Sequence, residues 1–256
     1  MTPDEITTQL SQQAQQCHQL LDAISRQWQQ EYQDQGGQLF CRAGCANCCR
    51  LQVQATWNEA LSIAAHLDIP QHERLAGYLP RLQQLTHEAS DYKNLLHQIR
   101  QQLPGCPFLD DSGCCTIYPW RPLACRALLS TREASWCGLD FADLNSEQKQ
   151  NFMAGLDPQV VDFPTHYAAA PRQFAAALEQ QLMQRQQQLT GTTLCGNLPL
   201  LVHLAADPSV RDVLHGPPQQ AQQQVKQLEQ NWPWLINPDI AITLSPPAHC
   251  DKNPRR

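Results

Sequence analysis

The sequence predicts an all-α fold, an irregular helical domain in which cysteine-rich metal-binding loops sit on a helical hairpin. Apolar residues recur at spacings of three and four over several long segments, which is typical of amphipathic helices. Strand-like alternation is almost absent. Nine of the twelve cysteines fall between Cys41 and Cys137, so the part of the chain that departs from helical patterning is rich in thiols.

The amino-terminal segment reads as one long helix. Thr2 is a favourable cap, Pro3 suits the first helical position, and Glu5 completes a capping box. Apolar residues then recur at helical spacing as far as Tyr32. The glycine pair at 36–37 ends the predicted helix.

Three further helices are expected downstream. The segment 56–59 repeats the capping-box pattern and opens a short helix, which Ile69-Pro70 is expected to close. Pro80 is expected to begin a longer helix that runs to Leu103. An amphipathic pattern from Pro171 to Leu189 predicts another helix, among shorter ones punctuated by proline.

A chain of 256 residues is long enough to bury a core, and we interpret it as a single domain with helical extensions. Four parts are expected along it. They are an amino-terminal amphipathic helix (1–40), a cysteine-cluster metal-binding part (41–140), a helical carboxy-terminal part packed on it (141–244) and a tail (245–256).

The charge balance excludes some partners. Lys and Arg total 18 against 24 Asp and Glu, a net charge of -6, so no positive field would attract nucleic acid. No apolar run approaches the roughly 20 residues of a membrane helix. The polar, acidic start differs from a signal peptide, so we expect a cytoplasmic protein without a membrane association. Cytosolic thiols stay reduced, which favours metal binding over disulfides for the clustered cysteines.

The clustered cysteines form two groups, separated by the predicted helical hairpin. The first group holds Cys41, Cys45, Cys48 and Cys49, and the second holds Cys106, Cys114 and Cys115, followed by Cys125 and Cys137. This arrangement suits a centre held from two sides. One zinc ion or one four-iron cluster takes about four thiolates, so thiols remain in surplus. One member of each adjacent pair can lie outside the ligand shell or serve a second centre.

The identity of the metal stays open between two alternatives. Adjacent cysteine pairs, surplus thiols and nearby arginines favour an iron-sulfur cluster of the [4Fe-4S] type, while structural zinc also uses four cysteines. Arg121 and Arg126 are the candidate cofactor-binding residues, because their charge can offset that of a thiolate centre. The histidines are scattered, and Cys17, Cys195 and Cys250 stand alone, so none of these is expected to be a ligand.

The segment 41–128 resembles a known family. Cys45-x-x-Cys48-Cys49 together with CPFLDDSGCCTIYPWRPLACR, residues 106–126, looks like the YkgJ-like CxxCxxCC cysteine-cluster family, which is described as zinc- or iron-chelating and is similar to the flagellin lysine N-methylases. The resemblance implies a metal-associated set of Cys41, Cys45, Cys48, Cys49, Cys106, Cys115 and Cys125. Three residues instead of two separate Cys41 from Cys45, and Cys114 is additional to the pattern.

Three functional classes follow. The first is a binding module whose iron-sulfur cluster serves redox chemistry, sensing or protein modification. The second is a protein-modifying enzyme, which the similarity to lysine N-methylases implies. The third is an interaction module that zinc stabilises. A protein substrate or a redox partner is expected, and no catalytic acid, base or nucleophile stands out by its spacing.

Overall fold

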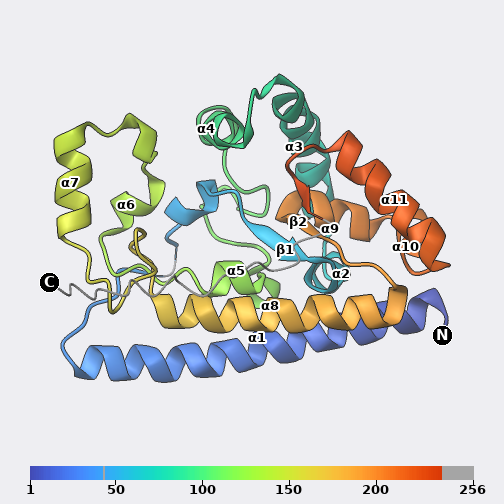
Figure 1. Ribbon diagram of the computed structural model, residues 1–256, viewed down its shortest axis with the longest axis horizontal. Coiled ribbons are helices and arrows are strands. Elements are labelled where there is room, and N and C mark those ends of the chain that lie inside the picture. Colours follow the sequence, from blue (N-terminus) through green and yellow to red (C-terminus); the bar gives the residue numbers. More distant parts are fainter. Residues whose placement is uncertain (43, 238–256) are drawn as a thin grey trace, which may run out of the picture.

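The computed structural model describes residues 1–42 and 44–237 and has a mostly helical architecture with one small sheet (Figure 1). The α-helices are α1 (Pro3–Asp34), α2 (Trp57–Ala64), α3 (Ile69–Glu88), α4 (Tyr92–Gln102), α5 (Leu123–Arg126), α6 (Ala134–Gly138), α7 (Ser146–Ala154), α8 (Ala169–Thr190), α9 (Leu198–Ala206), α10 (Pro208–Leu214) and α11 (Pro218–Asn231). Short 3-10 helices are η1 (Asn47–Arg50), η2 (Tyr118–Trp120) and η3 (Phe141–Asp143). The strands are β1 (Gln54–Thr56), β2 (Cys195–Asn197) and β3 (Ile236–Asn237).

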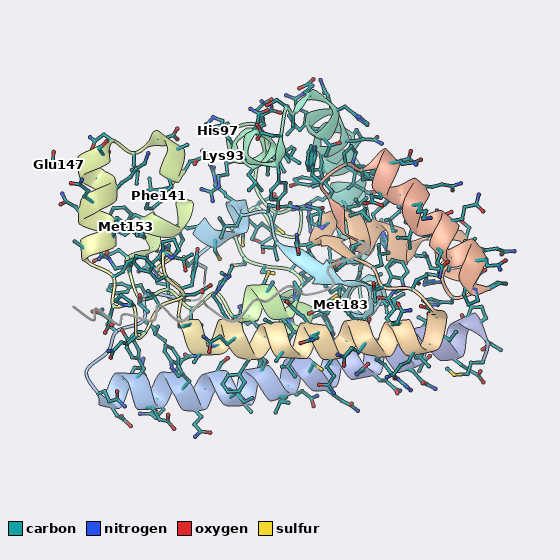
Figure 2. The ribbon with its side chains drawn as sticks, in the orientation of Figure 1. Lys93, His97, Phe141, Glu147, Met153 and Met183 are labelled. Atoms are coloured by element: carbon teal, nitrogen blue, oxygen red, sulfur yellow. The ribbon has the colours of Figure 1, made fainter. Side chains whose placement is uncertain are left out.

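The long helices are arranged in layers around the sheet. α1 and α8 run side by side along one face, while α3 and α4 lie on the opposite side of β1 (Figure 1). α6 and α7 form one end of the molecule, and α10 and α11 form the other. A side-chain contact connects α4 to the segment after α6. His97 of α4, labelled in Figure 2, has its Nδ1 atom 2.9 Å from an Asp140 carboxylate oxygen.

Two helix predictions are confirmed closely. α1 begins with the expected capping box, in which Thr2 Oγ1 accepts from the Glu5 N–H and the Glu5 carboxylate accepts from the Thr2 N–H. α8 covers the predicted 171–189 segment and ends at Gly191, whose φ of 73° is the left-handed cap conformation that glycine adopts at low cost. Local capping chemistry therefore determines these helix ends.

The two proline-based boundaries are wrong. Ile69 and Pro70 do not close the preceding helix but begin α3, because Asp68 caps it and proline is tolerated in a first helical turn. Pro80 lies inside α3 and does not begin a helix. The predicted helix from Pro80 to Leu103 is broken at 89–91, where Asp91 caps α4 by accepting a hydrogen bond from the Asn94 N–H.

The small sheet was not predicted. β2 lies in the middle and pairs antiparallel with β1 on one side and β3 on the other. A Cβ atom on Gly196 would lie 2.2 Å from the Leu235 carbonyl oxygen, so only glycine permits this approach of two chains. The sheet thereby joins β1, which follows the first cysteine group, to β2 and β3 in the carboxy-terminal part of the chain.

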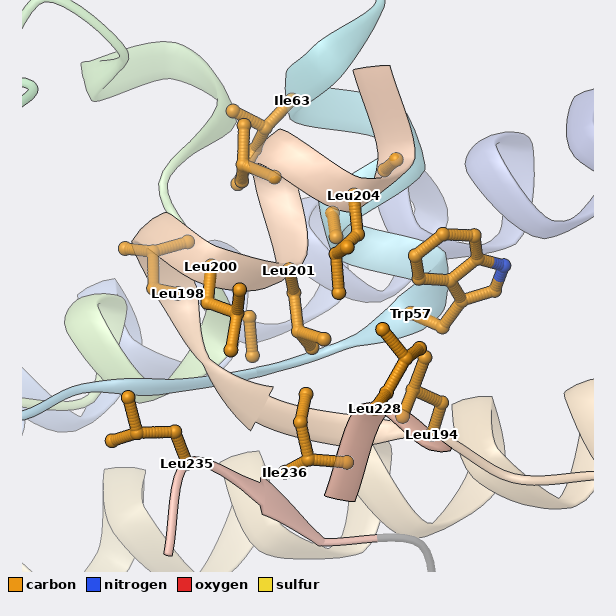
Figure 3. Packing of buried hydrophobic residues seen from close by; sticks show 14 of the residues in the cluster. Trp57, Ile63, Leu194, Leu198, Leu200, Leu201, Leu204, Leu228, Leu235 and Ile236 are labelled. Carbon is orange, nitrogen blue, oxygen red and sulfur yellow. The ribbon is translucent and has the colours of Figure 1, made fainter. Parts of the chain in front are cut away.

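The largest core packs around the sheet. Trp57, at the start of α2, is fully buried together with leucines of α9 (Figure 3). Its indole Nε1 donates a hydrogen bond to His215 Nε2 at 2.9 Å, which satisfies the one polar atom of the ring. A second core joins α1, α5 and α8 and includes Cys17, as expected for this cysteine.

A buried carboxylate connects these two cores. Glu59 of α2 has no exposed surface, and its two oxygens accept hydrogen bonds from the Leu123 N–H, from Thr56 and from His18 Nε2. Burial raises the pKa of Glu59, but the hydrogen bonds and the charge of His18 outweigh it and hold the pKa below its usual value. The carboxylate therefore joins α1, α2 and the start of α5.

Glu179 on α8 gives a pH-dependent stability. Burial and the negative charge of Glu59 raise its pKa to about 8 from 4.5. The contribution of protonated Glu179 to the free energy of unfolding is therefore fully present below about pH 4.5 and is lost as the pH rises through 8. We expect urea unfolding to show a smaller loss of stability between about pH 5 and 8.5 in Glu179→Gln than in the unsubstituted protein. The exposed Glu147→Gln variant is the control and should follow the unsubstituted curve.

Candidate metal centre

Three segments bring the cysteines together. Cys48 and Cys49 lie in η1, Cys106 and Cys115 lie in the loop after α4, and Cys125 lies in α5. The Cys106 N–H donates to the Cys49 carbonyl oxygen at 2.9 Å and so holds the first two segments against each other. Gly105, with φ of 109°, turns the chain beside that carbonyl oxygen in a conformation that favours glycine.

The loop that carries Cys106 and Cys115 is held together by hydrogen bonds within its own backbone. Leu109 and Cys115 form an antiparallel bridge, and the Thr116 N–H donates to the Phe108 carbonyl oxygen at 2.8 Å. Asp110 accepts hydrogen bonds from the N–H groups of Ser112 and Cys114 and closes the turn at Gly113. This turn places Cys115 toward Cys106 and leaves Cys114 exposed.

A cavity of about 460 Å³ lies where the three segments meet. Seven cysteines line it: Cys45, Cys48, Cys49, Cys106, Cys114, Cys115 and Cys125. The rest of the wall includes apolar side chains of α4 together with Asn197, Leu198 and Pro199 at the start of α9. The cavity therefore combines sulfur ligands with a mostly apolar lining.

Four of these thiols interact mutually. Burial raises the pKa of Cys106 to about 12, and the charges of Cys115 and Cys48 add to the increase. Burial is the main cause of the raised pKa of Cys115 and of Cys125; the charge of Cys48 adds to the first, and the charges of Cys106, Cys48 and Cys115 add to the second. Every pair among Cys48, Cys106, Cys115 and Cys125 thus interacts at the cavity, and Cys48 interacts in addition with Cys49, Cys41 and Cys137.

The chemistry of this set fits a soft metal. Raised thiol pKa values mean that the four protons are retained until a cation replaces them, so metal binding would release protons. Within residues 1–42 and 44–237, no three Cys, His, Asp or Glu side chains are close enough to hold a single ion as they stand. The four thiols instead surround the cavity.

The two candidate arginines have different places. Arg121 lines the cavity, its charge lowers the pKa of Cys48, Cys115 and Cys125 against the larger effect of burial, and its guanidinium lies 4.1 Å from the Tyr118 ring centroid. Arg126 does not line the cavity. It is buried, pairs with Asp22 and donates to the Arg121 and Pro119 carbonyl oxygens, and its binding to a cofactor stays a prediction.

Cys41 and Cys137 lie apart from the cavity wall. Cys41 Sγ accepts a hydrogen bond from the Ser130 N–H at 3.2 Å, and Cys137 of α6 lies 3.3 Å from His166 Nε2. No motif in the sequence points to His166, because 29 residues separate it from Cys137. Cys195 is buried in β2, as expected, and Cys250 lies outside the described residues.

The comparison with family models gives one match. Residues 40–150 match the family described as "CxxCxxCC: Putative zinc- or iron-chelating domain". This segment, which is less than half of the chain, is similar to the CxxCxxCC domain. The match covers the cavity cysteines and also Cys41 and Cys137, and it confirms the resemblance that the sequence motifs carry. Similarity to the flagellin lysine N-methylases stays a prediction.

The other comparisons add no relatives. No curated protein and no solved structure matched the chain. The CxxCxxCC domain therefore supplies the chemical class, zinc or iron chelation, and the geometry of the cavity supplies the candidate ligands. Among the described helices, none combines the length and the hydrophobicity needed to cross a membrane.

Proposed function

We propose that the CxxCxxCC domain binds one [4Fe-4S] cluster in the cavity, with Cys48, Cys106, Cys115 and Cys125 as its ligands. The observation that carries this proposal is the mutual interaction of these four thiols around one cavity. Cysteine thiolates in this number are the usual ligand shell of a cubane cluster. Cys45 and Cys49 also line the cavity and would surround the cluster rather than bind it.

The size of the cavity favours a cluster over a zinc ion. Zinc binds sulfur at about 2.3 Å, so four thiolates around one zinc must converge on a single point. Here the thiols line a cavity of about 460 Å³. A cluster of four irons and four sulfides occupies such a space without drawing three segments of backbone inward.

The surrounding residues support one-electron chemistry. A bound cluster supplies a site that accepts and gives up an electron. Arg121 lies at the thiols and offsets part of their negative charge, while Ile99, Leu103 and Leu198 provide an apolar wall that limits water. We infer a redox or sensing role in a reducing compartment such as the cytoplasm, exerted on a protein partner.

The test is anaerobic purification followed by a visible absorption spectrum and by iron, sulfide and zinc analysis of one sample. We expect a brown protein whose cavity holds about four iron and four sulfide per chain. Ser substitution of Cys106 or Cys115 should remove this iron, whereas Cys17→Ala, which removes a core thiol that does not line the cavity, should retain it. A colourless protein with zinc bound through the same cysteines would overturn the cluster and leave a structural zinc site.

Arg121 should tune the reduction potential. Replacing it with glutamine removes a positive charge beside the cluster and makes the added electron less favourable, so the potential should fall. A lost attraction on the order of 1 kcal/mol corresponds to roughly 40 mV for one electron. Redox titration of the visible band measures this potential, with Arg185→Gln, a partly exposed arginine of α8 that does not line the cavity, as the charge-matched control. An unchanged potential in Arg121→Gln would contradict this role.

A further inference from the structure

Five cysteines of the matched segment are not proposed ligands of the cluster, and two of them, Cys41 and Cys137, do not line the cavity. Cys41, Cys45 and Cys137 come from the chain before η1 and from α6. Asn47 fixes α6 on η1, because its Nδ2 donates to the Ala134 carbonyl oxygen at 2.8 Å. The Gly138 backbone packs against the same asparagine side chain. Cys137 is therefore held close to the first cysteine group although it lies 88 residues after Cys49.

The segment 128–131 organises the other side of these thiols. Cys41 Sγ donates to the Leu128 carbonyl oxygen at 3.5 Å and accepts from the Ser130 N–H at 3.2 Å. The next residue, Thr131, donates its N–H to the His166 carbonyl oxygen at 3.0 Å. One short stretch of backbone thus positions Cys41 on one side and His166 on the other.

The three thiols are near each other as well. Cys41 interacts electrostatically with Cys137, Cys48 and Cys45, and Cys137 interacts with Cys48 and Cys45, so these thiols lie beside Cys48 at the edge of the cavity. Cys137 and His166 are each only 6% exposed, and Cys137 Sγ lies 3.3 Å from His166 Nε2. Two ligands on one tetrahedral zinc, with bonds of 2.3 Å to sulfur and 2.05 Å to nitrogen, would be separated by about 3.5 Å. The Cys137 and His166 side chains already have nearly this separation.

We propose that Cys41, Cys45, Cys137 and His166 form a second metal site at the edge of the cavity, whose wall includes Cys45, and that it takes a thiophilic metal through three thiolates and one imidazole nitrogen. Three cysteines and one histidine are a recognised ligand set of structural zinc. Binding releases the protons of the three thiols, and Cys41 and Cys45 move toward the pair formed by Cys137 and His166. The bound metal would fasten α6 and the 128–131 segment to the chain before η1.

The experiment compares metal content in full-length variants purified anaerobically. Iron, sulfide and zinc are measured per chain in the unsubstituted protein and in Cys137→Ser, His166→Ala, Cys125→Ser and Cys17→Ala. Cys137→Ser should lose one equivalent of zinc while keeping the iron, sulfide and visible spectrum of the cavity centre. Cys125→Ser should lose the cavity centre and keep the zinc. Cys17→Ala should keep both, and circular dichroism verifies that each variant is folded.

His166→Ala keeps the proposal testable if Cys137→Ser does not fold. It should weaken zinc binding at least tenfold in a competition titration with a chelator, with the iron content unchanged. Iron in place of zinc at this site would appear as a loss of iron from Cys137→Ser beyond the four atoms of the cavity, and it would still support two sites. Unchanged metal content in both variants, or loss of all metal from each of them, would overturn the second site. Because zinc loss is read independently, a cavity without a cluster would not affect this result.

Discussion

Cys125→Ser will remove the metal from the cavity and loosen the chain around residues 41–60 and 104–137. A thiolate site does not exist in the unfolded chain, so metal affinity contributes directly to folding free energy. These segments consist largely of short loops together with η1, β1 and α5, and they are anchored to the cores by a few buried side chains such as Trp57, Phe108 and Leu123. Hydrogen exchange of the variant, compared with the metal-loaded protein, should show lost protection in both segments and retained protection in α1 and α8.

A chelator provides an independent route to the same state. Metal removal from the unsubstituted protein should reproduce the exchange pattern of Cys125→Ser, and limited proteolysis should cut within the two segments. Cys17→Ala treated in the same way should become loose only after chelation. A metal-free protein with the helicity and the cooperative unfolding of the loaded form would show that the centre contributes nothing to folding.

Glu59→Gln will destabilise the protein by roughly 3 to 5 kcal/mol, the usual cost of removing one partner from a buried charge network. The amide nitrogen of glutamine can only donate, yet the site offers it donors from Leu123, Thr56 and His18. The donors that face the new amide nitrogen, either those of Thr56 or those of His18 and Leu123, therefore lose their acceptor in a site with no exposed surface. Urea unfolding at neutral pH measures the difference.

The chain contains a matched control for this substitution. Glu5 occupies the same capping-box position in α1, but it is exposed. Glu5→Gln keeps an acceptor oxygen in water and should cost less than about 1 kcal/mol. Equal effects of the two substitutions would mean that the capping box, and not the buried network, accounts for the role of Glu59.

The sequence predicts those features that depend on neighbouring residues. Thr2 and Glu5 determine the start of α1 within four residues, and the glycines at 105 and 113 have the positive φ that the cysteine motifs require. The helix boundaries predicted from proline were wrong for two reasons. Pro70 is compatible with a first helical turn because a cap precedes it, and Pro80 is accommodated inside α3 because helix packing continues beyond it. The alternation L-Q-V-Q-A-T at 51–56 indicates β1, but a three-residue strand is too short to stand out.

The sequence predicts candidate ligands but not their grouping. Spacing predicts that the clustered cysteines bind metal, yet which thiols share a cavity depends on where η1, the 104–118 loop and α5 meet in space. Likewise, nothing local distinguishes Arg121 at the cavity from Arg126 in its ion pair with Asp22. Contact between Cys137 and His166 arises from the pairing of distant loops, so no spacing rule reveals it.

The wall that Asn197, Leu198 and Pro199 contribute to the cavity lies outside the matched segment 40–150. These residues reach the cavity because β2 pairs with β1, directly after the first cysteine group. The lifetime of a cluster in air would therefore depend on residues that the cysteine motif does not contain. Proteins with the same motif and a different carboxy-terminal half would share ligands but differ in their tolerance of oxygen.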